Sequence, residues 1–521
     1  MVDYDAIVVG GGHNGLICAA YLARAGLQTL LLERRAILGG ACVTEEIPGA
    51  PSHLISTGAA QLGNLPPAII ADLGLAGFGY EMLLPDPLSV FLLDDGRHLT
   101  LWRDGERTLE EIRGFSAADA RALPAYQADC NAFCDVIEPM LDADQAPSLD
   151  AIEAAFRGAG RSDLFSDFML GSIHDLLRSR FENEAVQAAL GLAATFGTNA
   201  GPQTPGTAYV MAHHLFGGTT GVRGRTGYVK GGMGGLADAL ARAATHHGAE
   251  LRTDVEVARI IIQEGRARGV QLADGRCIQA SMVISNADPQ RTFLGLVGES
   301  YLSPAFSTAI NSIQVRGQAL KVNCALDRLP KFTGLPPEMT PARVTICPSL
   351  DYVEAAWQQA KQGQLSQNPF MTVHMQSAID PSLAPQNRHT LTCYAQYFPY
   401  DLDPSLGGWG NQRERAGKIV LDTVAHHAPD LHEVISATEV MTPLDIERRF
   451  FMTGGHQFHG DLIIDQLFDQ RPAPGCDGAR TPVDGLYLCG ASAHPGGCVW
   501  GVPGQRAART VITDAAANVF D

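Results

Sequence analysis

The chain has 521 residues, 45% of them hydrophobic, and its 38 basic and 56 acidic residues give a formal net charge of −18. This length predicts two or more domains, and the acidic balance argues against nucleic acid or anionic lipid as an electrostatic partner. The eleven scattered cysteines include no C-x-x-C pair, which favours reduced thiols in a cytoplasmic protein. The sequence contains neither a signal peptide nor an apolar stretch of transmembrane length.

The first thirty-odd residues predict a nucleotide-binding unit. Residues 6–9 form a short β-branched run typical of a buried strand, residues 16–25 have helical apolar spacing, and residues 28–32 predict a second buried strand. Three glycines separate the first strand from the helix at G-x-G-x-x-G spacing. The whole unit is stronger evidence than a glycine-rich turn alone.

Each glycine of this turn has a physical purpose. Gly10 allows the tight turn, Gly12 lets a pyrophosphate approach the backbone, and Gly15 lets the helix pack closely on the strand. The helix N-terminus favours phosphate, so the intervening residues His13 and Asn14 are also predicted to contact the cofactor. Glu33 ends the second strand, where its carboxylate can accept both hydroxyls of an adenosine ribose.

A second glycine turn follows at Gly39, Gly40 and Ala41. The run from Glu33 to Ala41, which includes Arg34, resembles the two-glycine motif of flavoproteins in the amine oxidase and phytoene desaturase superfamily. The run at residues 10–16 resembles the phytoene dehydrogenase-related branch, which is similar to pyridine nucleotide-disulfide oxidoreductase domain-containing protein 2. The resemblance implies that the bound dinucleotide is FAD.

Residues 51–221 predict a mostly helical insertion that covers the substrate. Apolar spacing predicts helices at 119–137, 162–177 and 184–194. The apolar content suits a hydrophobic cavity, and a peripheral membrane contact at its mouth is a second expectation.

Residues 230–257 predict a helix followed by a strand at 250–257. No buried strand directly precedes this glycine-rich run, so the favoured interpretation is a helix that returns the chain to the first domain. The resemblance implies that the main chain at Val255 and Val257 contacts adenine, and that the run at 283–289, with Asn286, belongs to the cofactor site.

Residues 301–444 predict an antiparallel sheet that forms the floor of a substrate pocket, with strands at 320–326, 343–347, 369–375 and 390–398. Helices are predicted at 353–362 and 414–427. Lys321 is a lone cation within the first of these strands. It is either a snorkelling strand lysine or, as the resemblance implies, the lysine that hydrogen-bonds through water to flavin N5.

The C-terminal region predicts a buried strand that ends at Gly490 and a helix at 501–513 with Pro503 in its first turn. The resemblance implies that Gly490 and Ala491 lie along the pyrophosphate and ribityl chain. It also implies that the helix N-terminus at Trp500, Gly501 and Val502 points toward the flavin ring. Many such flavoproteins have aspartate in place of Ala491.

The histidines suggest weaker hypotheses. His459 and His494 are candidates for handling a proton, although backbone hydrogen bonding is the simpler role. His456 and His459 are three apart, but no carboxylate or cysteine completes a metal site. No Gly-x-Ser-x-Gly motif predicts a nucleophilic serine.

The sequence therefore predicts an α/β flavoprotein with a discontinuous Rossmann-like FAD domain and an inserted α+β substrate domain. Residues 1–60, 226–300 and 451–521 are assigned to the FAD domain, and residues 61–225 and 301–450 to the substrate domain. The expected activity is dehydrogenation or desaturation of a hydrophobic substrate such as a polyene. An amine oxidase, a redox-neutral flavin isomerase and a non-enzymatic binder of lipidated partners remain alternatives. The electron acceptor and the oligomeric state stay open.

Overall fold

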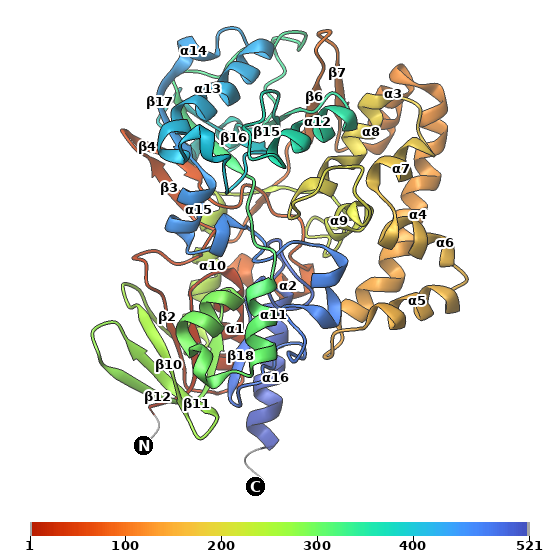
Figure 1. Ribbon diagram of the computed structural model, residues 1–521. Helices are drawn as coiled ribbons and strands as arrows, with labels where there is room; N and C mark the ends of the chain where they lie inside the picture. The colour runs from red at the N-terminus through yellow and green to blue at the C-terminus, as the bar shows by residue number, and fades with distance from the viewer. Residues whose placement is uncertain (1–2, 518–521) are drawn as a thin grey trace.

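The computed structural model describes residues 3–517, so the ends of the predicted ranges 1–60 and 451–521 lie outside the described residues. Two seven-stranded sheets lie in the lower and upper halves of the molecule as it is viewed in Figure 1, and a group of helices lies to the right. The boundaries assigned to the two domains stay a prediction.

The lower sheet collects strands from distant parts of the chain. Its order is β10-β11-β12-β1-β2-β9, and β18 pairs with β12. Strands β1, β2, β9, β12 and β18 pair in parallel, whereas β10, β11 and β12 are antiparallel. The strands are β1 (Tyr4–Val9), β2 (Thr29–Leu32), β9 (Glu250–Arg252), β10 (Val257–Gln263), β11 (Arg266–Leu272), β12 (Cys277–Ser285) and β18 (Leu486–Leu488).

Strand β1 is buried on both faces, as its β-branched run predicts. Ala6 and Val8 belong to the core that also contains the helices α1 (His13–Arg24), α10 (Met233–His246) and α16 (Val502–Ala517). Ile7 and Val9 point into a second core beneath β10 and β11. This discontinuous Rossmann-like arrangement confirms the predicted fold class.

The upper sheet has the order β17-β13-β16-β15-β14-β6-β7. All its pairs are antiparallel except β14 with β6. Its strands are β6 (Ser89–Leu92), β7 (His98–Leu101), β13 (Leu320–Leu326), β14 (Arg343–Ile346), β15 (Phe370–His374), β16 (His389–Gln396) and β17 (Ile435–Met441). The sheet predicted between residues 301 and 444 is therefore present.

Alternation along β13 gives the upper sheet two different faces. Val322 and Cys324 pack in one core with Val420 of α13 (Trp409–His427). Lys321 and Asn323 therefore point to the opposite face. The other helices of this region are α12 (Leu350–Ala360), α14 (Leu431–Val434) and α15 (Pro443–Phe450), whereas α11 (Pro304–Ser312) packs in the core of the lower sheet.

The region predicted to be mostly helical contains a helical cap and several strands. The predicted helix at 162–177 is wrong as a single element, because the chain leaves the helix at Gly171 (φ −73°, ψ 158°). The helices are α2 (Pro67–Asp72), α3 (Gly105–Phe115), α4 (Ala117–Asp142), α5 (Leu149–Gly158), α6 (Ser162–Leu164), α7 (Ile173–Arg178), α8 (Glu184–Gly191) and α9 (Thr207–His213), with a π-helical turn at Phe165–Leu170.

Two strand predictions also need correction. The hairpin β6–β7 lies within the expected helical insertion, yet it extends the upper sheet. The predicted strand 250–257 is interrupted between β9 and β10, because Asp254 adopts a positive φ of 56°. Short pairs also join β3 (Thr44–Ile47) to β4 (Ala50–Ser56) and β5 (Met82–Leu83) to β8 (Tyr228–Val229).

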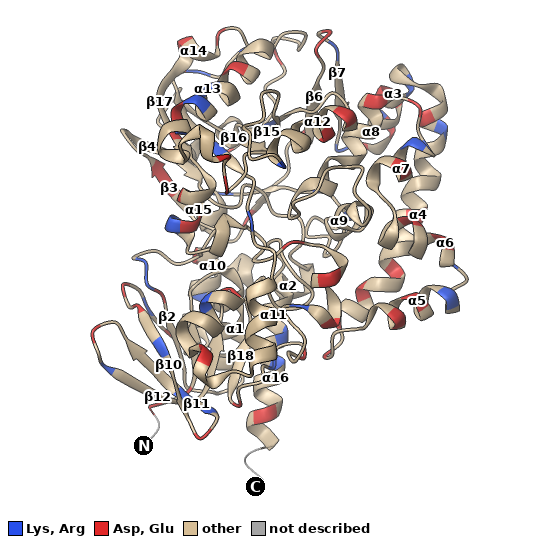
Figure 2. Cartoon of the chain, viewed as in Figure 1, with Lys and Arg blue, Asp and Glu red and all other residues tan. Residues whose placement is uncertain are grey.

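Acidic and basic residues are interspersed over the helices and loops in Figure 2, in keeping with a charge of −18 that is spread along the chain. Within residues 3–517, no helix has the length and apolar character needed to cross a membrane.

Buried Asp119 fixes the start of α8 against α4. Its carboxylate is 1% exposed and accepts hydrogen bonds from the backbone N–H groups of Glu182 (2.8 Å) and Asn183 (3.0 Å). We expect Asp119→Ala to lower the free energy of unfolding by about 3 kcal/mol, because two charge-assisted hydrogen bonds are lost. Urea denaturation measures the change. Asp150→Ala in exposed α5 is the control, with a loss below about 1 kcal/mol, and equal losses would contradict this role.

Candidate functional site

The glycine loop between β1 and α1 has no room for side chains. Gly10 has a φ of 102°, which favours glycine. A Cβ atom on Gly12 would lie 2.7 Å from Nδ2 of Asn286, and one on Gly15 would lie 2.2 Å from the carbonyl oxygen of Gly10. Because these glycines carry no side chains, a ligand can approach the backbone at the N-terminus of α1.

Glu33 holds the glycine loop at the end of β2. Its Oε2 accepts a hydrogen bond from the backbone N–H of Gly11 (2.8 Å), and its Oε1 accepts one from the N–H of Arg35 (2.9 Å). A carboxylate oxygen can accept more than one hydrogen bond, so both oxygens keep capacity for the hydroxyls of a ligand. Glu33 is 7% exposed and lines the cavity described below, as does Arg34.

The second glycine turn packs directly on the first. The backbone N–H of Gly39 donates to the carbonyl of Gly11 (2.7 Å), and a Cβ on Gly40 would lie 3.0 Å from Cα of Gly12. Ala41 and Gly40 line the cavity, whereas Gly39 lies behind them. The structure thus brings together the two glycine turns that the sequence predicts.

The opposite wall of this region comes from later in the chain. The N–H of Val255 donates to the carbonyl of Glu33 (2.9 Å), and the N–H of Asn286 donates to that of Val9 (2.8 Å). Val255, Val257, Asn286 and Ala491 all line the cavity. Gly490 does not line it, because it packs against the main chain of Asn286.

The start of α16 lies outside the cavity lining. The Trp500 ring packs against Phe216, with 5.7 Å between the ring centroids. Gly501 contacts side chains of α1 and α2, and a Cβ on Gly504 would lie 2.3 Å from the carbonyl oxygen of Asn14. Trp500, Gly501, Val502 and Gly15 are thus close to the site without lining it, and their predicted contact with a cofactor stays a prediction.

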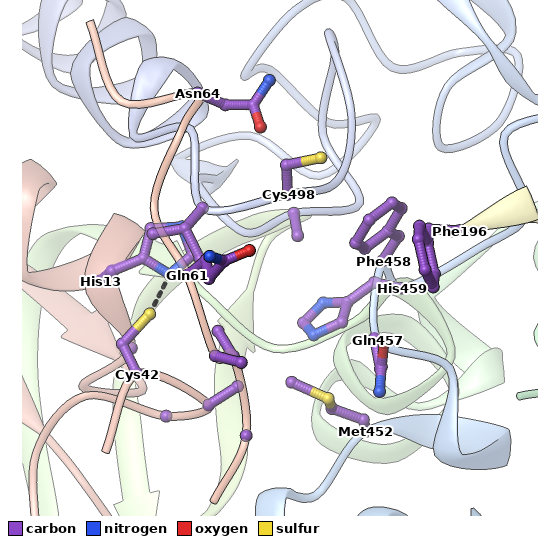
Figure 3. A pocket seen from close by; sticks show the side chains of 18 of the residues that line it. His13, Cys42, Gln61, Asn64, Phe196, Met452, Gln457, Phe458, His459 and Cys498 are labelled. Atoms are coloured by element: carbon purple, nitrogen blue, oxygen red, sulfur yellow. Dashed lines mark hydrogen bonds between the residues drawn. The ribbon is translucent and has the colours of Figure 1, made fainter. Parts of the chain in front are cut away.

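A single cavity of about 1060 Å³ joins the glycine turns to the upper sheet and the helical cap. Beyond the glycine turns it opens into a part that we call the apolar chamber. Figure 3 shows Phe196, Phe458 and His459 in one part of this cavity. The apolar chamber is lined by Tyr126, Leu190, Phe196, Met211, Leu215 and Phe458.

Lys321 lines this cavity and is 1% exposed. Its Nζ donates to the backbone carbonyls of Ser56 (2.9 Å), Thr57 (2.8 Å) and Gly58 (2.7 Å). Burial lowers the pKa of Lys321 to about 7. The three carbonyl acceptors match the three N–H donors of an ammonium group and oppose that shift. Its predicted role toward flavin N5 stays a prediction.

Two buried histidines face the same cavity in a neutral state. Burial lowers the pKa of His13 and of His459 to about 4, and Asp288 opposes this shift at His459. His13 Nε2 and His459 Nδ1 are buried without a hydrogen-bond partner among the described residues. His494 lies outside the lining, and burial lowers its pKa well below the ordinary value.

Among residues 3–517, no group of three or more His, Cys, Asp or Glu side chains could hold a metal ion. His456 instead pairs with Asp461, with 2.6 Å between Nε2 and Oδ1. The histidine spacing noted in the sequence therefore belongs to a buried hydrogen-bonded pair.

The residues at the glycine turns fit a dinucleotide. Two turns without Cβ atoms meet at a helix N-terminus, where phosphates are favoured. Asn14 Oδ1 and His13 Nε2 are buried polar atoms without partners in the described chain, and Glu33 can accept two hydroxyls. The fold and site together define a two-part nucleotide-binding oxidoreductase architecture whose second half forms a large apolar chamber.

Comparison with known families agrees with this architecture. The model of the flavin containing amine oxidoreductases matches residues 15–317, which is more than half of the chain. The chain belongs to this family. Membership implies a flavin cofactor and places the protein among flavin oxidoreductases.

Curated relatives confirm the branch that the glycine motifs resemble. Pyridine nucleotide-disulfide oxidoreductase domain-containing protein 2 of Mus musculus is 37% identical over 98% of this chain and 94% of its own length. A subunit of the limonene dehydrogenase of Castellaniella defragrans is 28% identical over 99% and 96%. A lycopene-forming phytoene desaturase of Pseudescherichia vulneris is 24% identical over 96% of each chain. A solved oxidoreductase from Methanosarcina mazei shares the fold, with a TM-score of 0.61, 17% identity and coverage of 98% and 100%.

The sequence interpretation missed the side chains that shape the apolar chamber. Phe196 and Phe458 lie in loops, and Tyr394 lies on β16, so no local motif unites them. Arg343 does carry a signal in the sequence. It is a single cation in the predicted strand 343–347, just as Lys321 is a single cation in the predicted strand 320–326. Gln61 carries no signal in the sequence.

The lack of space at Gly12 gives the first prediction for this site. We expect Gly12→Ala to lower the flavin content at least tenfold, because its Cβ would displace Asn286 and crowd the start of α1. Absorbance of flavin per protein measures the loss. Gly114→Ala in α3 is the matched control, because its Cβ would meet nothing within 4 Å. Equal flavin content in both variants would remove the glycine turn from the cofactor site.

The lowered pKa of His459 gives a second prediction, about pH. Between about pH 6.5 and pH 4 the unfolded histidine binds a proton and the folded one does not, so stability falls as pH falls through this range. We expect His459→Gln to remove up to about 3 kcal/mol of this decline. Thermal unfolding between about pH 6.5 and pH 4, of both flavin-free and flavin-loaded protein, measures this loss of stability. His432→Gln is the control, because His432 is exposed. An unchanged decline in His459→Gln would contradict the neutral buried state.

Proposed function

We propose that the protein is an FAD-dependent dehydrogenase or desaturase that removes a hydride from a hydrophobic substrate. The observation that supports this most strongly is the single cavity that joins the two glycine turns to an apolar chamber. Such an arrangement can hold a dinucleotide at one end and an apolar molecule at the other. FAD, when bound, supplies the group that accepts the hydride.

The chain's own residues would mainly bind and orient. The glycine turns and Glu33 would hold the pyrophosphate and the adenosine ribose, and the main chain at Val255 and Val257 would lie beside the adenine. Phe196 and Phe458 would exclude water and fix the substrate against the ring. His459 is neutral at pH 7. It can therefore accept a proton as a base, but it cannot act as an imidazolium acid.

The relatives support dehydrogenation of apolar molecules, since they include a subunit of a limonene dehydrogenase and a phytoene desaturase. Intact Gly10, Gly12, Gly15 and Glu33 weigh against a binder of lipidated partners that has abandoned the flavin. Val222 is 45% exposed and lines the cavity, so the mouth lies close to this loop. A peripheral membrane contact near this mouth, in a cytoplasmic protein, is part of the proposal.

An amine oxidase is the second candidate, because aromatic side chains and Lys321 share the cavity. The rings of Phe196 and Tyr394 lie 5.5 Å apart. Charge argues against a cationic amine, since Glu33 and Glu256 are the only acidic side chains among the described residues that line the cavity. Both lie at the nucleotide end.

The visible spectrum of the purified protein tests this proposal. We expect bound oxidised flavin that bleaches without oxygen on addition of an apolar substrate, and a product two hydrogen atoms lighter by mass spectrometry. Bleaching by amines alone would favour the amine oxidase, and a product of unchanged mass would favour an isomerase. A colourless protein that does not take up added FAD would contradict every flavin enzyme and leave the binding protein.

A further inference from the structure

One face of the upper sheet carries a row of polar side chains into the cavity. Residues that pair across neighbouring strands share a face. Lys321 pairs with Tyr394, and Tyr394 pairs with Thr372. Two residues further along β15, His374 pairs with Arg343 on β14. All five of these residues line the cavity, with Lys321 and Arg343 three strands apart, or about 14 Å.

Arg343 lacks a counter-ion. Its Nη1 donates to Oε1 of Gln61 (2.7 Å) and to Oγ1 of Thr226 (3.3 Å). Its Nε and Nη2 make no hydrogen bond to the residues that the structure describes, and Nε is fully buried. No carboxylate of residues 3–517 forms an ion pair with it, whereas the cavity-lining Arg223 and Arg291 are both paired with carboxylates. A buried charge without a partner is costly.

The residues around Arg343 are fixed in place but leave donors free. Gln61 uses Oε1 to accept from Arg343 and from Thr226 (3.2 Å), so its amide nitrogen points elsewhere and has no partner in the described chain. Because Oε1 must face the guanidinium, the orientation of the amide is determined by this contact. Gln61 therefore holds the guanidinium of Arg343 in place at the cavity wall.

The neighbouring His374 adds no competing charge. Its Nδ1 lies 2.9 Å from the hydroxyl of Tyr228, and its Nε2 lies 3.0 Å from Oγ1 of Thr372. Burial, together with the charge of Arg343, lowers the pKa of His374 well below its ordinary value. With both nitrogens satisfied and the ring neutral, the charge at this end of the row is that of Arg343.

We propose that Arg343, oriented by Gln61, binds the carboxylate of a long-chain apolar acid, whose chain runs through the apolar chamber toward the glycine turns. Nη1 is engaged and Nε is fully buried, so Nη2 is the group of Arg343 that remains to donate a charge-assisted hydrogen bond to the carboxylate. The apolar chamber beside them suits the hydrocarbon chain. This inference rests on the proposed function and narrows its substrate class to apolar carboxylic acids.

The distance along the sheet gives the site its specificity for length. Three strand spacings, about 14 Å, separate the strand of Arg343 from that of Lys321, and the glycine turns lie beyond Lys321. A short acid held at Arg343 cannot reach the nucleotide end, whereas a long chain can. Affinity should therefore rise with chain length from butanoate through octanoate to dodecanoate, because burial of each added methylene group contributes about 0.8 kcal/mol to the binding free energy.

Binding to the flavin-loaded, full-length protein tests the inference without requiring turnover. Calorimetry should show that dodecanoate binds at least tenfold more tightly than dodecanol or dodecylamine. Arg343→Gln should weaken dodecanoate ten- to a hundredfold and leave dodecanol unchanged. Arg388→Gln is the matched control, since Arg388 is half exposed and already paired with Asp327, and it should leave both ligands unchanged.

A second variant keeps the test decisive if Arg343→Gln fails to fold. Gln61→Glu places a carboxylate beside the guanidinium, so it should raise the melting temperature and weaken dodecanoate at least tenfold. Equal binding of dodecanoate and dodecanol, tighter binding of dodecyl phosphate than of dodecanoate, or unchanged affinity in Gln61→Glu would overturn the assignment. Selective binding of dodecanoate with no reduction of the flavin by any acid would uphold this site and contradict the proposed dehydrogenase.

Discussion

The ammonium group of Lys321 joins the two halves of the molecule. It projects from β13, the second strand of the upper sheet, and its three donors meet three consecutive backbone carbonyls at residues 56–58. Those carbonyls lie at the end of β4, which the chain reaches from the glycine turns through β3. A buried lysine normally loses its proton readily, so this contact stabilises both the charge and the path of the segment.

The segment held by Lys321, residues 57–64, forms one wall of the cavity, with all of its residues except Leu62 in the lining. Its start is tied to the nucleotide half, since Thr57 donates to Glu45 (2.5 Å). Its end is tied to the helical cap, since Nδ2 of Asn64 donates to the carbonyls of His213 (3.2 Å) and Phe216 (3.0 Å). Gln61 lies between these anchors. The same short segment therefore positions the flavin end, the apolar chamber and the neighbour of Arg343.

Local signals in the sequence were sufficient for much of the fold. The burial of β1 on both faces, the glycine turns and the strand at 320–326 follow from local residue patterns and turn chemistry alone. The hairpin β6–β7 was missed although Asp95-Gly96 between two apolar runs is a turn signal. The break in the strand at 250–257 was not predictable, because it depends on backbone hydrogen bonds from residues 254 and 255 to Arg35 and Glu33, more than 200 residues away.

The two cavity-lining cations of the upper sheet, Lys321 and Arg343, show why the site was harder to predict than the fold. In the sequence, Lys321 and Arg343 look alike, since each is a single positive charge in an apolar strand. In the structure, every donor of Lys321 has a backbone acceptor, whereas Arg343 has only Nη1 engaged. A satisfied buried cation stabilises the protein that surrounds it, and an unsatisfied one facing a cavity stabilises an anion that enters. That distinction depends on which acceptors lie nearby in space, so it exists only once the chain has folded.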